Sequence, residues 1–127
     1  MKILALIARL LLGLTFTVFG LNGFFHFIPG ELPAGLAGQF LGALMSTHYV
    51  HVISAFEVVA GILFLIGLYV PLALALIAPI IVNILLYHAF LAPQGYQPAL
   101  IVTICWIISF VYNRSAFAGI FQAKVIH

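Results

Sequence analysis

Four long apolar runs follow one another along the chain, and each is long enough to form a helix across a membrane. They cover about residues 3–28, 47–69, 71–91 and 98–117. A helix needs about 20 residues to cross roughly 30 Å of hydrocarbon. The pattern therefore predicts an all-α fold: an integral membrane four-helix bundle in which residues 1–127 form a single membrane domain.

The segment between the first two runs has a shorter apolar pattern of its own. Leu32, Leu36, Phe40 and Leu44 recur every four residues, as they would on one face of an amphipathic helix. Glycines at positions 35, 38 and 42 weaken such a helix but allow close packing. We expect a short interfacial or re-entrant helix here, with an irregular loop as the alternative.

Composition and charge agree with a membrane location and give an orientation. Hydrophobic residues make up 66% of the chain and charged residues only 5%, whereas soluble domains carry about 25% charged residues. A net charge of +2 does not indicate nucleic acid as a partner. Basic residues favour the cytoplasmic side of a membrane. Both termini are expected there, because the Lys and Arg residues all lie in the two terminal segments: Lys2, Arg9, Arg114 and Lys124.

Glu57 is the one acidic residue inside an apolar run. At 1.5 Å per residue it lies about 15 Å inside the second run, near the midplane of the membrane. A carboxylate at that depth costs several kcal/mol unless it is paired, protonated or facing a polar cavity. Arg9, roughly 10 Å from the inner boundary, either forms an ion pair with Glu57 or extends its side chain to the headgroups.

Other polar residues from all four runs lie at similar depths in the outer half of the membrane. On the second run, His51, Ser54 and Glu57 cover an arc of about 120°. We therefore expect an outward-facing polar pocket around Glu57 and Asn83. Its candidate ligand-binding residues are Asn22, His26, His51, Glu57, Asn83, Tyr87, His88 and Trp106. Glu57 is the one candidate catalytic residue, and the sequence leaves open whether the protein is an enzyme.

Three segments carry a resemblance to a known family. They read ARLLLGLTFTVFGLNGFFHFIP, FEVVAGILFLIGLYVPLAL and NILLYHAFLAP. In their spaced polar and glycine positions they resemble the DoxX and DoxX-like membrane proteins. The resemblance implies a multi-pass four-helix bundle of the bacterial inner membrane. Some relatives are tied to quinone-linked oxidation of sulfur compounds, and others to oxidative-stress complexes.

The first functional hypothesis is a subunit or accessory of a redox-associated, quinone-linked membrane complex. A quinone site needs an apolar slot, aromatic walls and polar groups at the quinone carbonyls, and the candidate pocket supplies these residue types. The partners would be the lipid bilayer and a membrane or peripheral redox subunit. The chain alone is not expected to perform dithiol exchange, because Cys105 is its single cysteine.

Three alternatives belong to other classes. In the first, the protein is a non-catalytic scaffold or assembly partner whose buried polar residues only pack helices. In the second, His26, His51 and His88 hold a metal or a haem, although the sequence has no HxxxH ligand spacing and we predict no metal site. In the third, the protein transports a small solute, which at four spans would require a homo-oligomer.

Overall fold

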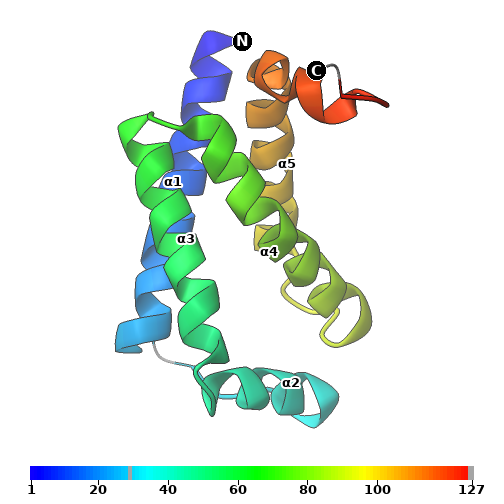
Figure 1. The fold of residues 1–127 in the computed structure, drawn as a ribbon. Coiled ribbons are helices and arrows are strands. Elements are labelled where there is room, and N and C mark those ends of the chain that lie inside the picture. The colour runs from blue at the N-terminus through cyan, green and yellow to red at the C-terminus, as the bar shows by residue number, and fades with distance from the viewer. Residues whose placement is uncertain (29, 126–127) are drawn as a thin grey trace.

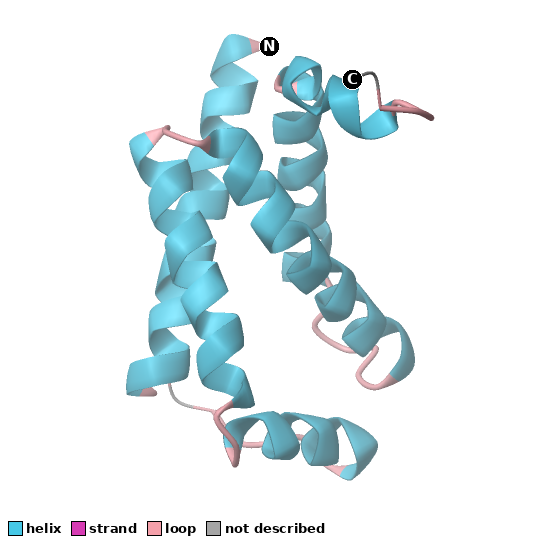
Figure 2. Ribbon diagram, viewed as in Figure 1, coloured by secondary structure: helices cyan, strands magenta, loops and turns pink. Residues whose placement is uncertain are grey.

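The computed structural model describes residues 1–28 and 30–125. Its elements are α1 (Lys2–Phe25), α2 (Gly35–Met45), α3 (Tyr49–Ile66), α4 (Val70–Phe90), α5 (Gln97–Tyr112) and a 3-10 helix, η1 (Arg114–Phe121). Every regular element in this part of the chain is helical (Figure 2). The predicted all-α membrane fold is confirmed, including the short helix between the first two spans.

Three helices, α1, α3 and α4, are long and apolar enough to cross a membrane. The fourth run behaves differently, because α5 has 16 residues and then meets η1 at an angle of 83°. It ends at Tyr112 instead of continuing straight to residue 117. Asn113 terminates it, since both its backbone N–H and its side-chain amide donate to the carbonyl of Ser109. The chain then turns, and Phe117 of η1 packs against Phe110 with ring centroids 4.9 Å apart.

The helices are arranged so that the start of α1 and the last described helix, η1, lie at one end of the bundle, here called the terminal end (Figure 1). At the opposite end, the α2 end, helix α2 lies across the bundle (Figure 1). Helix α1 packs most extensively on α3, which runs antiparallel to it, and also contacts α5. Helix α4 contacts α3 and α5.

Glycines bring α1 and α3 into close contact. A methyl group added at Gly20 would lie 2.7 Å from a Val58 methyl carbon and 3.0 Å from Cβ of Glu57. A methyl group at Gly61 would lie 2.6 Å from the backbone nitrogen of Thr17. Small residues at such positions let two helix backbones approach each other in a membrane. The close pair of α1 and α3 therefore depends on glycine at both sites.

A tight hairpin joins α3 to α4, as the spacing of the second and third runs predicts. Gly67 ends α3 with a φ of 72°, and Tyr69 precedes α4 with a φ of 55°, so both adopt the left-handed conformation. Pro71 lies in the first turn of α4, where its missing N–H is harmless. Three residues, 67–69, thus reverse the chain.

The best-packed part of the bundle lies toward the terminal end. Its largest fully buried apolar side chains are Leu12, Phe16, Phe64, Leu74 and Ile77. Toward the α2 end, α4 diverges from α3 (Figure 1). In that half Phe56 of α3 and Leu86 of α4 are 45% and 48% exposed, so these faces are open to a ligand or to lipid.

Candidate functional site

A groove of about 440 Å³ lies beside α3 in the half of the bundle that carries α2. It is lined by Phe24, His51, Val52, Ala55, Phe56, Val59 and Leu76. Among these described residues, His51 alone has a polar side chain. Sequence reasoning identified His51 but missed the aromatic walls. The apolar stripe Val52, Phe56 and Val59, at spacings of four and three, was the signal that could have located them.

The imidazole of His51 is held by aromatic stacking. Its ring lies parallel to that of Phe24, with centroids 5.5 Å apart and an interplanar angle of 5°. Its Nδ1 is 3.4 Å from Nδ1 of His48, so one ring must donate and the other accept. The stack and this contact together orient a flat, polar ring in the lining of an apolar groove.

Two of the predicted pocket residues on α4 face the same way as the groove wall. Leu76, Asn83 and Tyr87 share one face of α4, because they are separated by seven and four residues. Asn83 is exposed, and its Nδ2 donates to the Pro79 carbonyl at 2.8 Å. The Tyr87 ring stacks on the ring of Phe40 of α2, with ring centroids 6.0 Å apart. Helix α2 therefore contacts this face of α4 near the C-terminal end of α4.

Glu57 lies on a different face of α3 from His51. Six residues separate the two, which at 100° per residue places them about 120° apart around the helix. The Glu57 side chain is half-buried, and its Cβ lies beside Gly20 of α1. The structure thus places Glu57 at the edge of the α1–α3 contact, outside the lining of the groove.

Arg9 has a different partner from the one considered in the sequence. Its Nη1 donates to the Phe64 carbonyl at 2.6 Å. Phe64 belongs to the last turn of α3, where carbonyls lack helical partners and a cation is favourable. Because Phe64 is seven residues beyond Glu57, roughly 10 Å along the axis, Arg9 caps α3 and does not form an ion pair with Glu57.

The other candidate residues make bonds to backbone. Asn22 Oδ1 accepts from the Ile28 N–H at 2.7 Å, just beyond His26, which ends α1 with a φ of 52°. His88 Nδ1 lies 3.0 Å from the Ala92 carbonyl oxygen. Trp106 Nε1 donates to the Leu74 carbonyl at 3.0 Å. These contacts terminate helices or join α5 to α4.

The histidines lie in separate surroundings. His51 stacks on Phe24, whereas His88 meets the edge of Tyr87 with centroids 5.1 Å apart. Within residues 1–28 and 30–125, no three His, Cys, Asp or Glu side chains are grouped so that they could hold a metal ion. Of the predicted pocket residues, His51 is the one that lines this groove.

The fold and these contacts define a small helical membrane protein whose polar residues gather at helix ends and beside one apolar groove. The family model of DoxX matches residues 4–92. The chain therefore belongs to the DoxX family, and the match covers α1 through α4. No curated protein and no solved structure gives a significant match to the chain.

Proposed function

We propose that this DoxX protein is an accessory subunit of a quinone-linked redox complex in the bacterial inner membrane, and that it binds a quinone ring in the groove beside His51. The observation that carries the proposal is the groove itself, with the parallel Phe24–His51 stack in its lining. A quinone ring is flat and apolar, with carbonyl oxygens that accept hydrogen bonds. A volume of about 440 Å³ lies within the roughly 300–1,000 Å³ usual for small-molecule sites.

The proposal assigns a role in quinone binding or proton exchange to polar and aromatic groups of α1, α3 and α4. An N–H of His51 donates to one quinone carbonyl, while Phe24 and Phe56 flank the ring. Asn83 and Tyr87 supply polar groups on the facing side of α4. Glu57, which lies on the other side of the α1–α3 contact from His51, is the candidate to exchange a proton when the quinone is reduced. An acidic side chain within a membrane span is commonly part of such a pathway.

The proposal includes an orientation. The start of α1 and η1 lie at one end of the bundle (Figure 1), and the two terminal segments carry all the Lys and Arg residues of the chain. Basic residues are retained on the cytoplasmic side, so we place the terminal end there. The groove then opens in the outer half of the membrane.

Titration of the purified protein with short-chain benzoquinones and naphthoquinones tests the proposal. Binding in the groove should quench Trp106 fluorescence saturably. His51→Leu should weaken binding by about tenfold, since a buried hydrogen bond is worth roughly 1 kcal/mol or more. His26→Asn is a matched control, because Asn tolerates the left-handed conformation at position 26. Quenching that never saturates, or that is equal in both variants, would contradict a site at His51.

A scaffold or assembly role is the second candidate, and one observation favours it. Arg9, Asn22, His88 and Trp106 each contact a backbone carbonyl or N–H of the chain itself. These groups are bonded within the chain, where they end helices or join one helix to another. Mild-detergent purification from native membranes would distinguish the roles. A scaffold should copurify with a stoichiometric membrane partner and bind no quinone, whereas a protein without a stable partner would exclude this role.

A further inference from the structure

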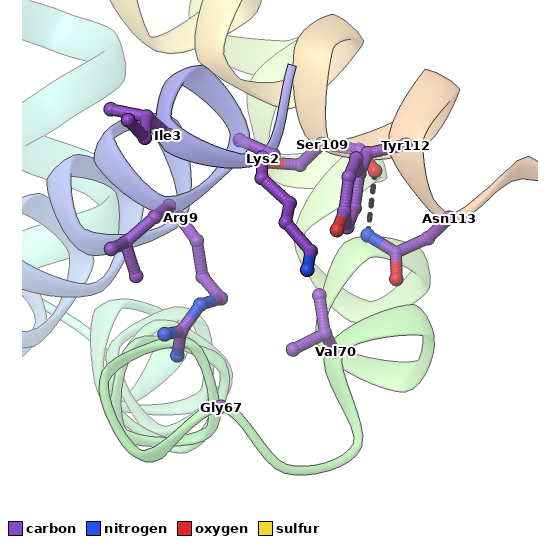
Figure 3. A pocket seen from close by; sticks show the side chains of 10 residues that line it. Lys2, Ile3, Arg9, Gly67, Val70, Ser109, Tyr112 and Asn113 are labelled. Atoms are coloured by element: carbon purple, nitrogen blue, oxygen red, sulfur yellow. Dashed lines mark hydrogen bonds between the residues drawn. The ribbon is translucent and has the colours of Figure 1, made fainter.

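A second cavity, of about 540 Å³, lies at the terminal end of the bundle, away from the groove. It lies between the start of α1, the turn that joins α3 to α4 and the end of α5 (Figure 3). Its polar lining comes from Lys2 and Arg9 of α1 and from Ser109, Tyr112 and Asn113 around the end of α5.

Two cationic side chains enter this cavity from the same face of α1. Lys2 and Arg9 are seven residues apart, which is two helical turns or roughly 10 Å. In Figure 3 the Lys2 ammonium extends toward Val70 and the Arg9 guanidinium toward Gly67, at the two ends of the turn that joins α3 to α4. Only one of the five N–H groups of a guanidinium is needed for the bond that Arg9 makes to Phe64. The other donors remain available to a ligand.

The described residues that line the cavity include no acidic side chain. Glu31 precedes α2 and Glu57 lies midway along α3, so both acidic residues of the chain are remote from it. The helix ends around the cavity offset one another, because the first turn of α4 contributes the positive end of a helix dipole while the last turns of α3 and α5 contribute negative ends, so the net positive charge comes from Lys2 and Arg9. The cavity therefore has a positive charge that the described lining does not neutralise.

Ser109 provides an independent indication of a ligand. Its side chain is 1% exposed and lines the cavity. Among the described residues, its Oγ has no hydrogen-bond partner. Leaving a buried hydroxyl without a partner is unfavourable, and such a group in a native protein calls for an explanation, for example a bound molecule. A ligand oxygen in the cavity would accept this hydrogen bond.

We propose that this cavity binds a phosphate group that carries net negative charge, held by Lys2 and Arg9 and by a hydrogen bond from Ser109 Oγ. The apolar side chains of Ile3 and Leu6 line the cavity too, and they are 74% and 45% exposed. They could accompany the acyl chains of an anionic lipid, while the cations alone would suit a free phosphate. This site does not depend on the proposed quinone site, and either can fail without the other.

Ligand binding to the full-length protein in detergent, followed by native mass spectrometry, tests the site. The probes are phosphatidylglycerol, phosphatidylcholine with the same acyl chains, and inorganic phosphate. Lys2→Gln should weaken binding of phosphatidylglycerol by about fivefold, the effect of one cation at a membrane surface. Lys124→Gln removes a matched cation that does not line the cavity, and binding should be unchanged.

Ser109→Ala separates binding from folding. It should also weaken binding by about fivefold, as loss of a hydrogen bond to a charged group would, but it should leave thermal stability undiminished because it deletes an unpartnered hydroxyl. Binding of phosphatidylglycerol alone, dependent on Lys2, would support a lipid ligand. Displacement of that lipid by inorganic phosphate would support a soluble one. Equal binding of the two lipids, or equal effects of Lys2→Gln and Lys124→Gln, would overturn the proposal.

Discussion

The substitution Gly61→Ala tests whether α1 and α3 are as close as the structure shows. The added methyl carbon would lie 2.6 Å from the backbone nitrogen of Thr17 and 3.1 Å from the carbonyl oxygen of Gly13. Optimal contacts between heavy atoms are about 3.5–4.0 Å. Because both neighbours are backbone atoms, they cannot rotate away, and the two helices would have to separate by about 1 Å.

Two opposing effects set the magnitude. Alanine is about 1 kcal/mol better than glycine within a helix, which favours the variant. Overpacking a tight contact costs about 1–3 kcal/mol. The separation also loosens neighbouring contacts along the same pair of helices, including the contact between Gly20 and Val58. We therefore expect Gly61→Ala to lower the free energy of unfolding by about 1–2 kcal/mol.

Denaturation by SDS in mixed micelles, followed by far-UV circular dichroism, measures this difference. Gly42→Ala is the matched control. A methyl group at Gly42, within α2, would lie 3.6 Å from a Leu32 methyl carbon, which is an ordinary contact. That variant should be as stable as the wild-type protein or slightly more stable. If Gly61→Ala also proved neutral or stabilising, the close approach of α1 and α3 would be refuted.

Substitutions at three further residues test other features of the structure, and fused reporter domains test the orientation of the termini. Arg9→Gln should lower the free energy of unfolding by about 1–2 kcal/mol, because the last turn of α3 loses its cationic cap; Arg9→Lys should lose less in the same denaturation. Trp106→Phe should cost about 1 kcal/mol, since the stack on Phe110 can remain while the bond to the Leu74 carbonyl is lost; unchanged stability would show that this bond contributes little. Glu57→Gln should leave stability unchanged, because Arg9, its candidate cation, is bonded to the Phe64 carbonyl. The same variant should reduce any quinone-dependent proton uptake. Marked unfolding would instead support the scaffold role. Reporter domains fused to each terminus should report the same, cytoplasmic, side in intact cells, and opposite sides would contradict an even number of crossings.

The length of each apolar run located the helices, because a helix needs about 20 apolar residues to cross the hydrocarbon of a membrane. The ends of the helices follow from local sequence signals. Gly67 ends α3 in the left-handed conformation that glycine adopts easily. The end of α5 was harder to predict, since the apolar run continues past it. The bonds of Asn113 to Ser109 and the packing of Phe117 turn the chain there. Those contacts depend on tertiary structure that hydropathy does not describe.

In the candidate site, helical periodicity predicts which residues share a face of α3, whereas packing between helices decides which of them are covered. The arc of His51, Ser54 and Glu57 follows from helical geometry alone. Its centre, Ser54, is 2% exposed and faces Gly23 of α1. Because α1 covers the middle of the arc, His51 and Glu57 emerge on opposite sides of that contact. Which helix covers an arc depends on pairing between helices, and hydrophobic periodicity does not specify that pairing.

Selectivity for a quinone in this groove has to come from polar contact. Lipid tails are as apolar as the groove walls, so in a membrane there is no hydrophobic gain that would favour a quinone over an acyl chain. At this end α4 diverges from α3 (Figure 1), and Val52, Phe56 and Val59 of the groove lining are 59%, 45% and 50% exposed, so an acyl chain could fill the same space. A hydrogen bond from His51 to a carbonyl is an interaction that an acyl chain cannot make. His51 is therefore the residue whose replacement should abolish the preference for quinone while leaving the groove able to hold lipid.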